Sequence, residues 1–151
     1  MTNNNLQIND SNQRSLSTLL RSLKLSQSRH SWTLVRCNHN PLREEMMQRL
    51  EELHDGEIGK IKLTKETTQL HVPIQKLKEE GKVKAVIIYG LEGVDIGTWL
   101  TNLKGSRYTC KEFWREISLP IIIWANDDIL KKIARLAPYF WCSHFFRVIN
   151  F

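Results

Sequence analysis

Two uninterrupted apolar runs constrain the fold more than any other feature of this sequence. The first run covers residues 85–89 (AVIIY) and the second covers residues 120–124 (PIIIW). Neither run alternates apolar with polar residues, as a strand with one solvent-facing side does, so both strands should be buried on both faces. Strands of this kind are typical of parallel sheets that are covered by helices on each side. We therefore predict that these two runs are the most central strands of a parallel sheet.

Three shorter segments complete the set of predicted strands, at residues 32–35, 58–63 and 145–151. Helical segments are expected between the strands, and this alternation is typical of an α/β fold with a parallel sheet. Right-handed crossover connections then place helices on both faces. The chain has 151 residues, which suits one domain. We expect a three-layer α/β sandwich with a mostly parallel five-stranded sheet.

Capping residues mark where the helices begin. After the first strand, Asn40 is a typical N-cap residue and Pro41 a typical first helical residue. The helix that they open extends to about Leu53, which shares an apolar face with Met46 and Leu50. Further helical segments are expected from Thr67 or Thr68 to Gly81, at residues 96–103 and 110–117, and from residues 126–128 to Pro138.

The N-terminal part has two different characters. Residues 1–14 are rich in Asn, Ser and Gln, and we expect a disordered tail there. From Ser15 onward, leucines at positions 16, 19, 20 and 23 follow the spacing of one helix face. The domain organisation predicted is thus a tail over residues 1–14 and a single α/β domain over residues 15–151 that opens with a helix.

The chain is basic, with 22 Lys and Arg against 16 Asp and Glu and a net charge of +6. The excess lies at the two ends, since residues 1–30 hold four basic residues and one acid, and residues 101–151 hold eight and four. Such a charge attracts nucleic acid or an anionic surface when it is concentrated in a patch. No run of Lys and Arg exceeds two residues, so we interpret the charge as a solvated surface with a modest positive bias.

Several classes of protein are excluded by simple patterns. No apolar run approaches the ~18 residues of a membrane span, and the first residues lack the basic-then-apolar order of a signal peptide. The three cysteines, at 37, 110 and 142, have no CxxC spacing. We expect a cytoplasmic protein with reduced thiols and no membrane partner.

The carboxyl ends of the predicted strands are the places to look for a ligand site, because ligands of open α/β sheets bind there. The turn after the first strand, residues 37–41 (CNHNP), contains no glycine, and none occurs between Met1 and Leu53. Both a P-loop and a dinucleotide-binding GxGxxG need glycines at this turn. The sequence therefore predicts no phosphate cradle of either kind.

Four other strand-end residues are candidates for chemistry: Glu92, Asp127, Asp128 and Cys37. Glu92 follows the third strand and is interpreted as a turn residue rather than a metal ligand or base. Asp127 and Asp128 follow the fourth strand and are interpreted as helix-capping acids rather than cation ligands. Cys37 and His39 lie two residues apart, but no third group completes a nucleophile and base set. No catalytic, cofactor-binding or metal-binding residue is predicted.

The C-terminal half is rich in tryptophan, with Trp99, Trp114, Trp124 and Trp141. Tryptophans can stack on bases. At helix and strand spacing they are more often anchors of a core or an interface, and that is the role expected here.

The second half of the chain resembles a known family. The segments that carry the likeness are Gly90–Glu92, Leu100–Leu103, Arg107, Phe113, Leu119–Leu130 and Leu136–Phe140. Across roughly residues 30–151 the chain resembles the N-terminal, P-loop-lacking AAA/STAND-like module of large multidomain bacterial proteins, many of them cyanobacterial. That module precedes tetratricopeptide repeats, WD40 repeats or caspase-like peptidase domains. The resemblance implies a signalling or scaffolding module with an NTPase-like fold and no hydrolysis machinery.

Three functions stay open on this evidence. The leading expectation is a non-catalytic domain that binds an unidentified protein partner, because no complete catalytic set is present. The alternative is a degenerate nucleotide-binding domain, with the helix start at residues 38–42 as the anion site and Glu92 or Asp127 nearby. The second alternative is a basic nucleic-acid-binding domain.

Overall fold

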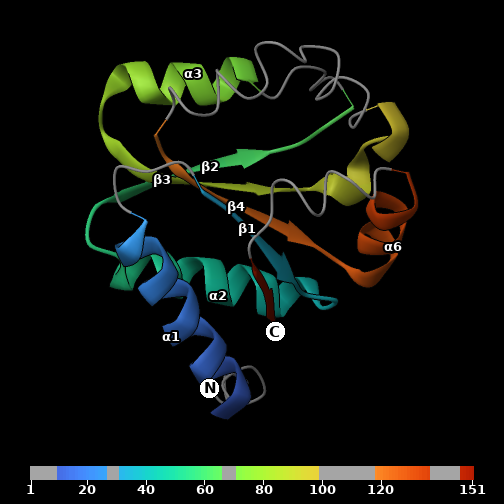
Figure 1. The fold of residues 1–151 in the computed structure, drawn as a ribbon, viewed down its shortest axis with the longest axis horizontal. Helices are drawn as coiled ribbons and strands as arrows, with labels where there is room; N and C mark the ends of the chain where they lie inside the picture. The colour runs from blue at the N-terminus through green and yellow to red at the C-terminus, as the bar shows by residue number, and fades with distance from the viewer. Residues whose placement is uncertain (1–9, 27–30, 66–70, 99–117, 137–146) are drawn as a thin grey trace.

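Five strands form one parallel sheet in the computed structural model, in the order β2-β3-β4-β1-β5 (Figure 1). The structure describes residues 10–26, 31–65, 71–98, 118–136 and 147–151. The strands are β1 (Ser31–Arg36), β2 (Glu57–Lys62), β3 (Val83–Tyr89), β4 (Pro120–Ala125) and β5 (Arg147–Asn150). All four pairings are parallel, which confirms the predicted five-stranded parallel sheet.

Helices cover both faces of this sheet. They are α1 (Asp10–Leu25), α2 (Asn40–Leu53), α3 (His71–Glu80) and α6 (Asp127–Leu136), with a short 3-10 helix η2 (Leu91–Gly93) after β3. Figure 1 shows α1 and α2 on one side of the sheet and α3 on the other. The core residues of α6 pack in the same cluster as those of α3. The predicted three-layer sandwich with a leading helix is therefore confirmed.

The central strand is β4, and all six of its residues are buried. Ile122 and Trp124 point into the core under α1 and α2, whereas Ile121 and Ile123 point into the core under α3 and α6. β3 and β1 flank β4. The run in β4 thus lies at the centre of the sheet, as predicted, and the run in β3 lies next to it, in a position equivalent to that of β1.

The two cores are built from the apolar stripes of the helices. α1 contributes Leu16, Leu19 and Leu23, each no more than 2% exposed. α2 adds Met46, Met47 and Leu50 to the same core. On the opposite face the buried helix residues include Ile74, Ile129 and Ile133. Their spacing of three and four residues allows each helix to bury one apolar stripe against the sheet.

Of the four tryptophans expected to anchor a core or an interface, Trp124 is the one that lies within the described residues. It is 1% exposed, and its ring stacks on that of Phe151 with a centroid distance of 5.5 Å and an interplanar angle of 20°. It is a core residue, as expected. Trp99, Trp114 and Trp141 lie outside the described residues.

Helix boundaries differ from the predicted ones in two places. α1 begins at Asp10, so residues 10–14 belong to the helix and not to the expected tail, whereas residues 1–9 lie outside the described residues. Asp10 lies in the first turn, where its negative charge interacts favourably with the positive end of the helix dipole. Asn40 is the first helical residue rather than the N-cap; the cap is His39, which makes no side-chain cap bond.

The predicted apolar face of α2 is wrong at its end. Leu53 is 60% exposed, because the buried stripe runs through Met46, Met47 and Leu50 and stops before the last residue of the helix. Other predictions fall outside the described residues: the helix start at 67 or 68, the helical segments over 99–117, and residues 145–146.

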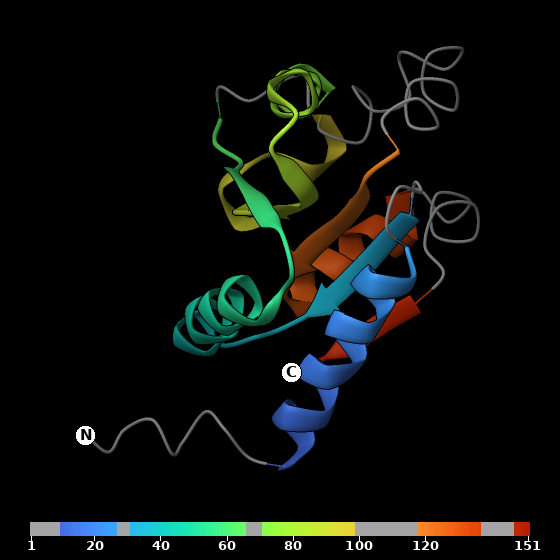
Figure 2. The ribbon, with the colours of Figure 1, turned by 90° about the vertical axis from the view of Figure 1, so that its left-hand side faces the viewer.

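α1 also covers part of the sheet edge. Figure 2 shows α1 beside β5. The Ser15 hydroxyl of α1 donates a hydrogen bond of 2.6 Å to the carbonyl of Asn150, the last residue of β5. A strand at the edge of a sheet has unpaired backbone groups that must be satisfied or protected. The leading helix therefore contributes to the fold in two ways, by burying leucines and by satisfying an edge carbonyl.

Gly90 allows the chain to leave β3 at a point of close backbone approach. Its φ is +89°, and a Cβ there would lie 2.9 Å from the carbonyl oxygen of Leu63 and 3.1 Å from its nitrogen. The Leu63 N–H donates to the carbonyl of Tyr89 at 2.8 Å, so the two segments are fixed to each other. Only glycine combines this dihedral angle with this contact.

Gly90→Ala is expected to destabilise the fold by roughly 2–3 kcal/mol, because it adds a backbone clash to the cost of a positive φ. Gly81→Ala is the matched control, since Gly81 has φ +71° and open space around its Cβ position; it should cost about 1 kcal/mol. Urea unfolding of both variants measures the difference. Equal losses of unfolding free energy in the two variants would show that the close contact with Leu63 adds nothing to the cost of the substitution.

Candidate functional site

The strand order creates one position where a ligand crevice is expected. From β1 the chain crosses to the far edge of the sheet through α2, whereas from β4 it passes over β1 to β5 through α6 on the opposite face. The connections that follow the adjacent strands β1 and β4 therefore diverge at the carboxyl edge. In open α/β sheets the ligand site lies at this switch point.

In this chain the two diverging connections are bonded to each other. The Cys37 N–H donates to the carbonyl of Ala125 at 3.0 Å, one residue beyond the end of β1. One step further, the Asp127 N–H donates to Asn38 Oδ1 at 2.8 Å, and Asn38 Nδ2 donates to Asp127 Oδ2 at 2.9 Å. The Asn38 amide thus pairs with both the backbone and the side chain of Asp127.

Arg36 completes this cluster, which we call the switch-point network: Arg36, Asn38 and Asp127. Its Nη2 donates to Asp127 Oδ2 at 2.7 Å, and its Nε donates to Oδ1. A bidentate guanidinium–carboxylate pair is among the strongest charge-assisted hydrogen-bond arrangements. The Arg36 and Asp127 side chains are 38% and 40% exposed, so the network lies at the rim of the sheet.

The network shifts the ionisation of Asp127. Hydrogen bonds from Arg36 and then from Asn38 stabilise the carboxylate and lower the pKa of Asp127 to about 2. The same pairing raises the pKa of Arg36.

Asp127 was predicted to be a helix-capping acid, and its main partner is instead Arg36, 91 residues away. The cap of α6 is Asn126, whose Oδ1 accepts from the Ile129 N–H at 2.9 Å, as predicted for residues 126–128.

A second polar cluster holds the start of α2 against the end of β3. Arg43 Nη1 donates to Glu92 Oε2 at 3.0 Å, and the Arg43 guanidinium lies 5.3 Å from the centre of the Tyr89 ring. Burial would raise the pKa of Glu92, but hydrogen bonds from its own backbone and from Arg43 lower it on balance. Glu92 is therefore an ion-pair partner of α2, in addition to its predicted place in a turn.

Cys37 and His39 do not form a nucleophile and base pair. The Cys37 thiol is buried and donates to the backbone carbonyl of His39 at 3.4 Å, not to the imidazole ring. Burial raises the pKa of this thiol, which favours the thiol over the nucleophilic thiolate. Within the described ranges, no three His, Cys, Asp or Glu side chains are grouped so that they could hold a metal ion.

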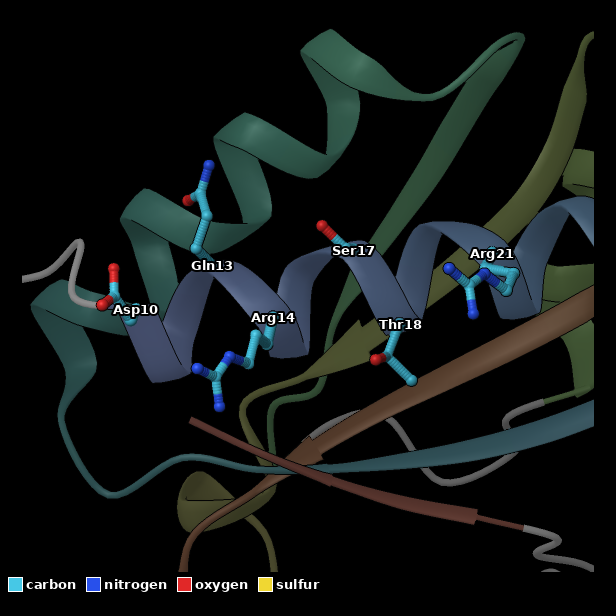
Figure 3. Close-up of a pocket in the computed structure, with 6 residues that line it drawn as sticks. All are labelled: Asp10, Gln13, Arg14, Ser17, Thr18 and Arg21. Carbon is cyan, nitrogen blue, oxygen red and sulfur yellow. The ribbon is translucent and has the colours of Figure 1, made fainter.

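An open hollow lies along the outer face of α1. Its described lining comes from this helix alone, and Figure 3 shows the side chains: Asp10, Gln13, Arg14, Ser17, Thr18 and Arg21. The buried leucines of α1 lie on the other side of the helix. A polar face opposite an apolar stripe is what a surface helix presents to water, so the hollow supports no ligand assignment.

The comparisons with known proteins found no match, so the functional conclusion rests on the geometry. No protein-family model matches the chain, and no curated protein or solved structure matches it either. Among the helices of the described part, none is long and apolar enough to cross a membrane.

The switch-point network predicts a specific dependence of stability on pH. The pKa of Asp127 is about 2 in the folded state, below its ordinary value of 3.8. The ionised form therefore stabilises the fold at pH above about 4, and this contribution is lost as the pH falls toward about 2. Asp127→Asn should remove that part of the acid sensitivity, so its stability should fall less steeply over this window.

Urea unfolding between about pH 2 and pH 6 measures this difference. Asp128→Asn is the matched control, because Asp128 is the exposed neighbour of Asp127 on the same helix turn. The control should keep the acid sensitivity of the unmodified chain. If Asp127→Asn and Asp128→Asn give the same pH profile, the ion pair with Arg36 does not stabilise the fold.

Proposed function

We propose that this chain is a non-catalytic protein-interaction module, of scaffolding or signalling type, with a degenerate NTPase-like fold. The observation that carries the proposal is the switch-point network. The two connections that form the walls of a ligand crevice in other open α/β sheets are joined here by the side chains of Arg36, Asn38 and Asp127. A closed switch point suits a domain that acts through its outer surface.

The geometry favours this proposal over a nucleotide-binding domain. A phosphate-binding loop presents free backbone N–H groups to the ligand. Here the Cys37 N–H is bonded to Ala125, and the Asp127 N–H is bonded to Asn38. Glu92 and Asp127, the acids expected near a nucleotide, are both paired with arginines of the chain. Binding a nucleotide at this edge would require these contacts to break.

The family resemblance supports the same proposal. The AAA/STAND-like module that the second half of the chain resembles also lacks a P-loop, and in multidomain bacterial proteins it precedes repeat or peptidase domains. A module of that kind has a protein partner rather than a small-molecule substrate. The partner of this chain is proposed only as a class, a protein.

A thermal-shift titration with ATP, ADP and GTP, each with and without Mg²⁺, tests the proposal. A ligand that binds only the folded state stabilises it by about 2.7 kcal/mol at a hundredfold excess over its Kd. We expect no saturable shift with any of the six combinations, because the switch point is closed. A saturable upward shift would contradict the proposal and favour the nucleotide-binding alternative.

The same protein sample tests the nucleic-acid alternative. Labelled single-stranded and duplex oligonucleotides are titrated at about 50 mM salt, where phosphate contacts are strong. The expected result is no binding. Binding that weakens steeply with added salt would replace the proposal with the second alternative. A protein that the chain captures is accepted as its partner only when the two purified proteins form a stoichiometric complex.

A further inference from the structure

We propose that Arg36 and Asn38 form an oxyanion-binding site, and that Asp127 occupies this site as an autoinhibitory ligand supplied by the chain itself. The class of external ligand is an anionic group with two or more oxygens, such as a phosphate or a carboxylate. Such a group would bind by displacing the Asp127 side chain.

The arrangement of donors is the first step of the argument. Three N–H groups converge on one carboxylate: Arg36 Nε, Arg36 Nη2 and Asn38 Nδ2. All three belong to β1 and the turn after it, whereas the carboxylate comes from the other connection, at the start of α6. A planar guanidinium fork with an added amide donor suits carboxylate and phosphate groups equally well.

The second step is that the donor geometry does not depend on the Asp127 carboxylate alone. Asn38 Oδ1 accepts from the backbone N–H of Asp127 at 2.8 Å, and this bond orients the amide so that Nδ2 points toward the site. A backbone N–H remains when the side chain is changed or displaced. The amide donor therefore stays in position for another oxyanion.

Access from solvent is the third step. The Arg36 and Asp127 side chains are 38% and 40% exposed, so an anion in solution can reach the guanidinium and compete with the carboxylate for it. Lys131 adds a positive potential that also favours the ionised form of Asp127. The cluster around Arg43 differs, because that side chain is only 13% exposed and is already paired with two glutamates. It offers no comparable site.

The test uses the full chain and replaces the internal ligand. Asp127→Asn keeps the shape of the side chain and removes the charge that repels an incoming anion. Sulfate is titrated at constant ionic strength, and the Arg36 Nε–Hε resonance and the melting temperature are recorded. We expect a saturable change in both for Asp127→Asn, with an apparent affinity roughly tenfold or more above that of the unmodified chain.

Two variants control the result. Asp128→Asn removes the same charge from the same helix turn and should respond to sulfate like the unmodified chain. Arg36→Met combined with Asp127→Asn should abolish the saturable response. If Asp127→Asn does not fold, Asp127→Ser is titrated in its place. Acetate and inorganic phosphate are then compared on the responding variant, which distinguishes a carboxylate from a phosphate as the preferred group.

An unchanged Arg36 resonance in the Asp127 variants, or an equal response in Asp128→Asn, overturns the inference and leaves the ion pair with a structural role only. The inference shares the switch-point network with the proposed function but needs no protein partner. The two fail separately, because Asp127 keeps the site occupied in the unmodified chain. A nucleotide shift in that chain therefore contradicts the proposed function, whereas an Asp127→Asn variant that does not respond to sulfate contradicts the oxyanion site.

Discussion

The parallel pairing of β4 with β1 on one side and β3 on the other places a fully apolar strand where it has no contact with water. All six residues of β4 are buried, so both faces of the sheet must carry a helical layer. Because crossover connections are right-handed, stepping from β1 to the far edge puts α2 on one face, and the later steps put α3 and α6 on the other. The position of the switch point follows from this arrangement.

The polar residues at the carboxyl edge are the consequence that matters for function. Adjacent parallel strands end together, so Arg36 at the end of β1 and Asp127 just after β4 are brought within bonding distance. At the next boundary, Arg43 joins the start of α2 to Glu92 after β3. The turn after β1 is thereby fastened on both sides. This explains how the connections at this edge can be bonded to each other, where in other open sheets they form the two walls of a crevice.

The layers of the fold could be predicted from the sequence because burial on both faces leaves a local signature. Runs such as residues 85–89 and 120–124 need no knowledge of their neighbours to be assigned to a sheet interior. The leucines of α1 predicted its buried face equally well, but its start at Asp10 was missed because residues 10–14 carry no leucine in the pattern. Asn40 was misassigned as a cap because residue type alone does not reveal its backbone conformation.

The site was harder to predict, because it depends on strand order. Asn38 and Asp127 were both recognised as strand-end residues, yet their mutual contact spans 89 positions and requires β1 to lie next to β4. No local pattern encodes that adjacency. Arg36 was overlooked for the same reason: as the last residue of a strand it is unremarkable until the neighbouring strand is known.

Hydrogen exchange of the Asp127 backbone amide tests the central claim most directly. This N–H donates to Asn38 Oδ1 across the switch point, so it should be protected in the unmodified chain. In Asn38→Ala the protection should be lost at Asp127, while the amides of β4 stay protected. If the Asp127 amide of the unmodified chain exchanges as fast as a solvent-exposed one, the two connections are not joined and the switch point is open.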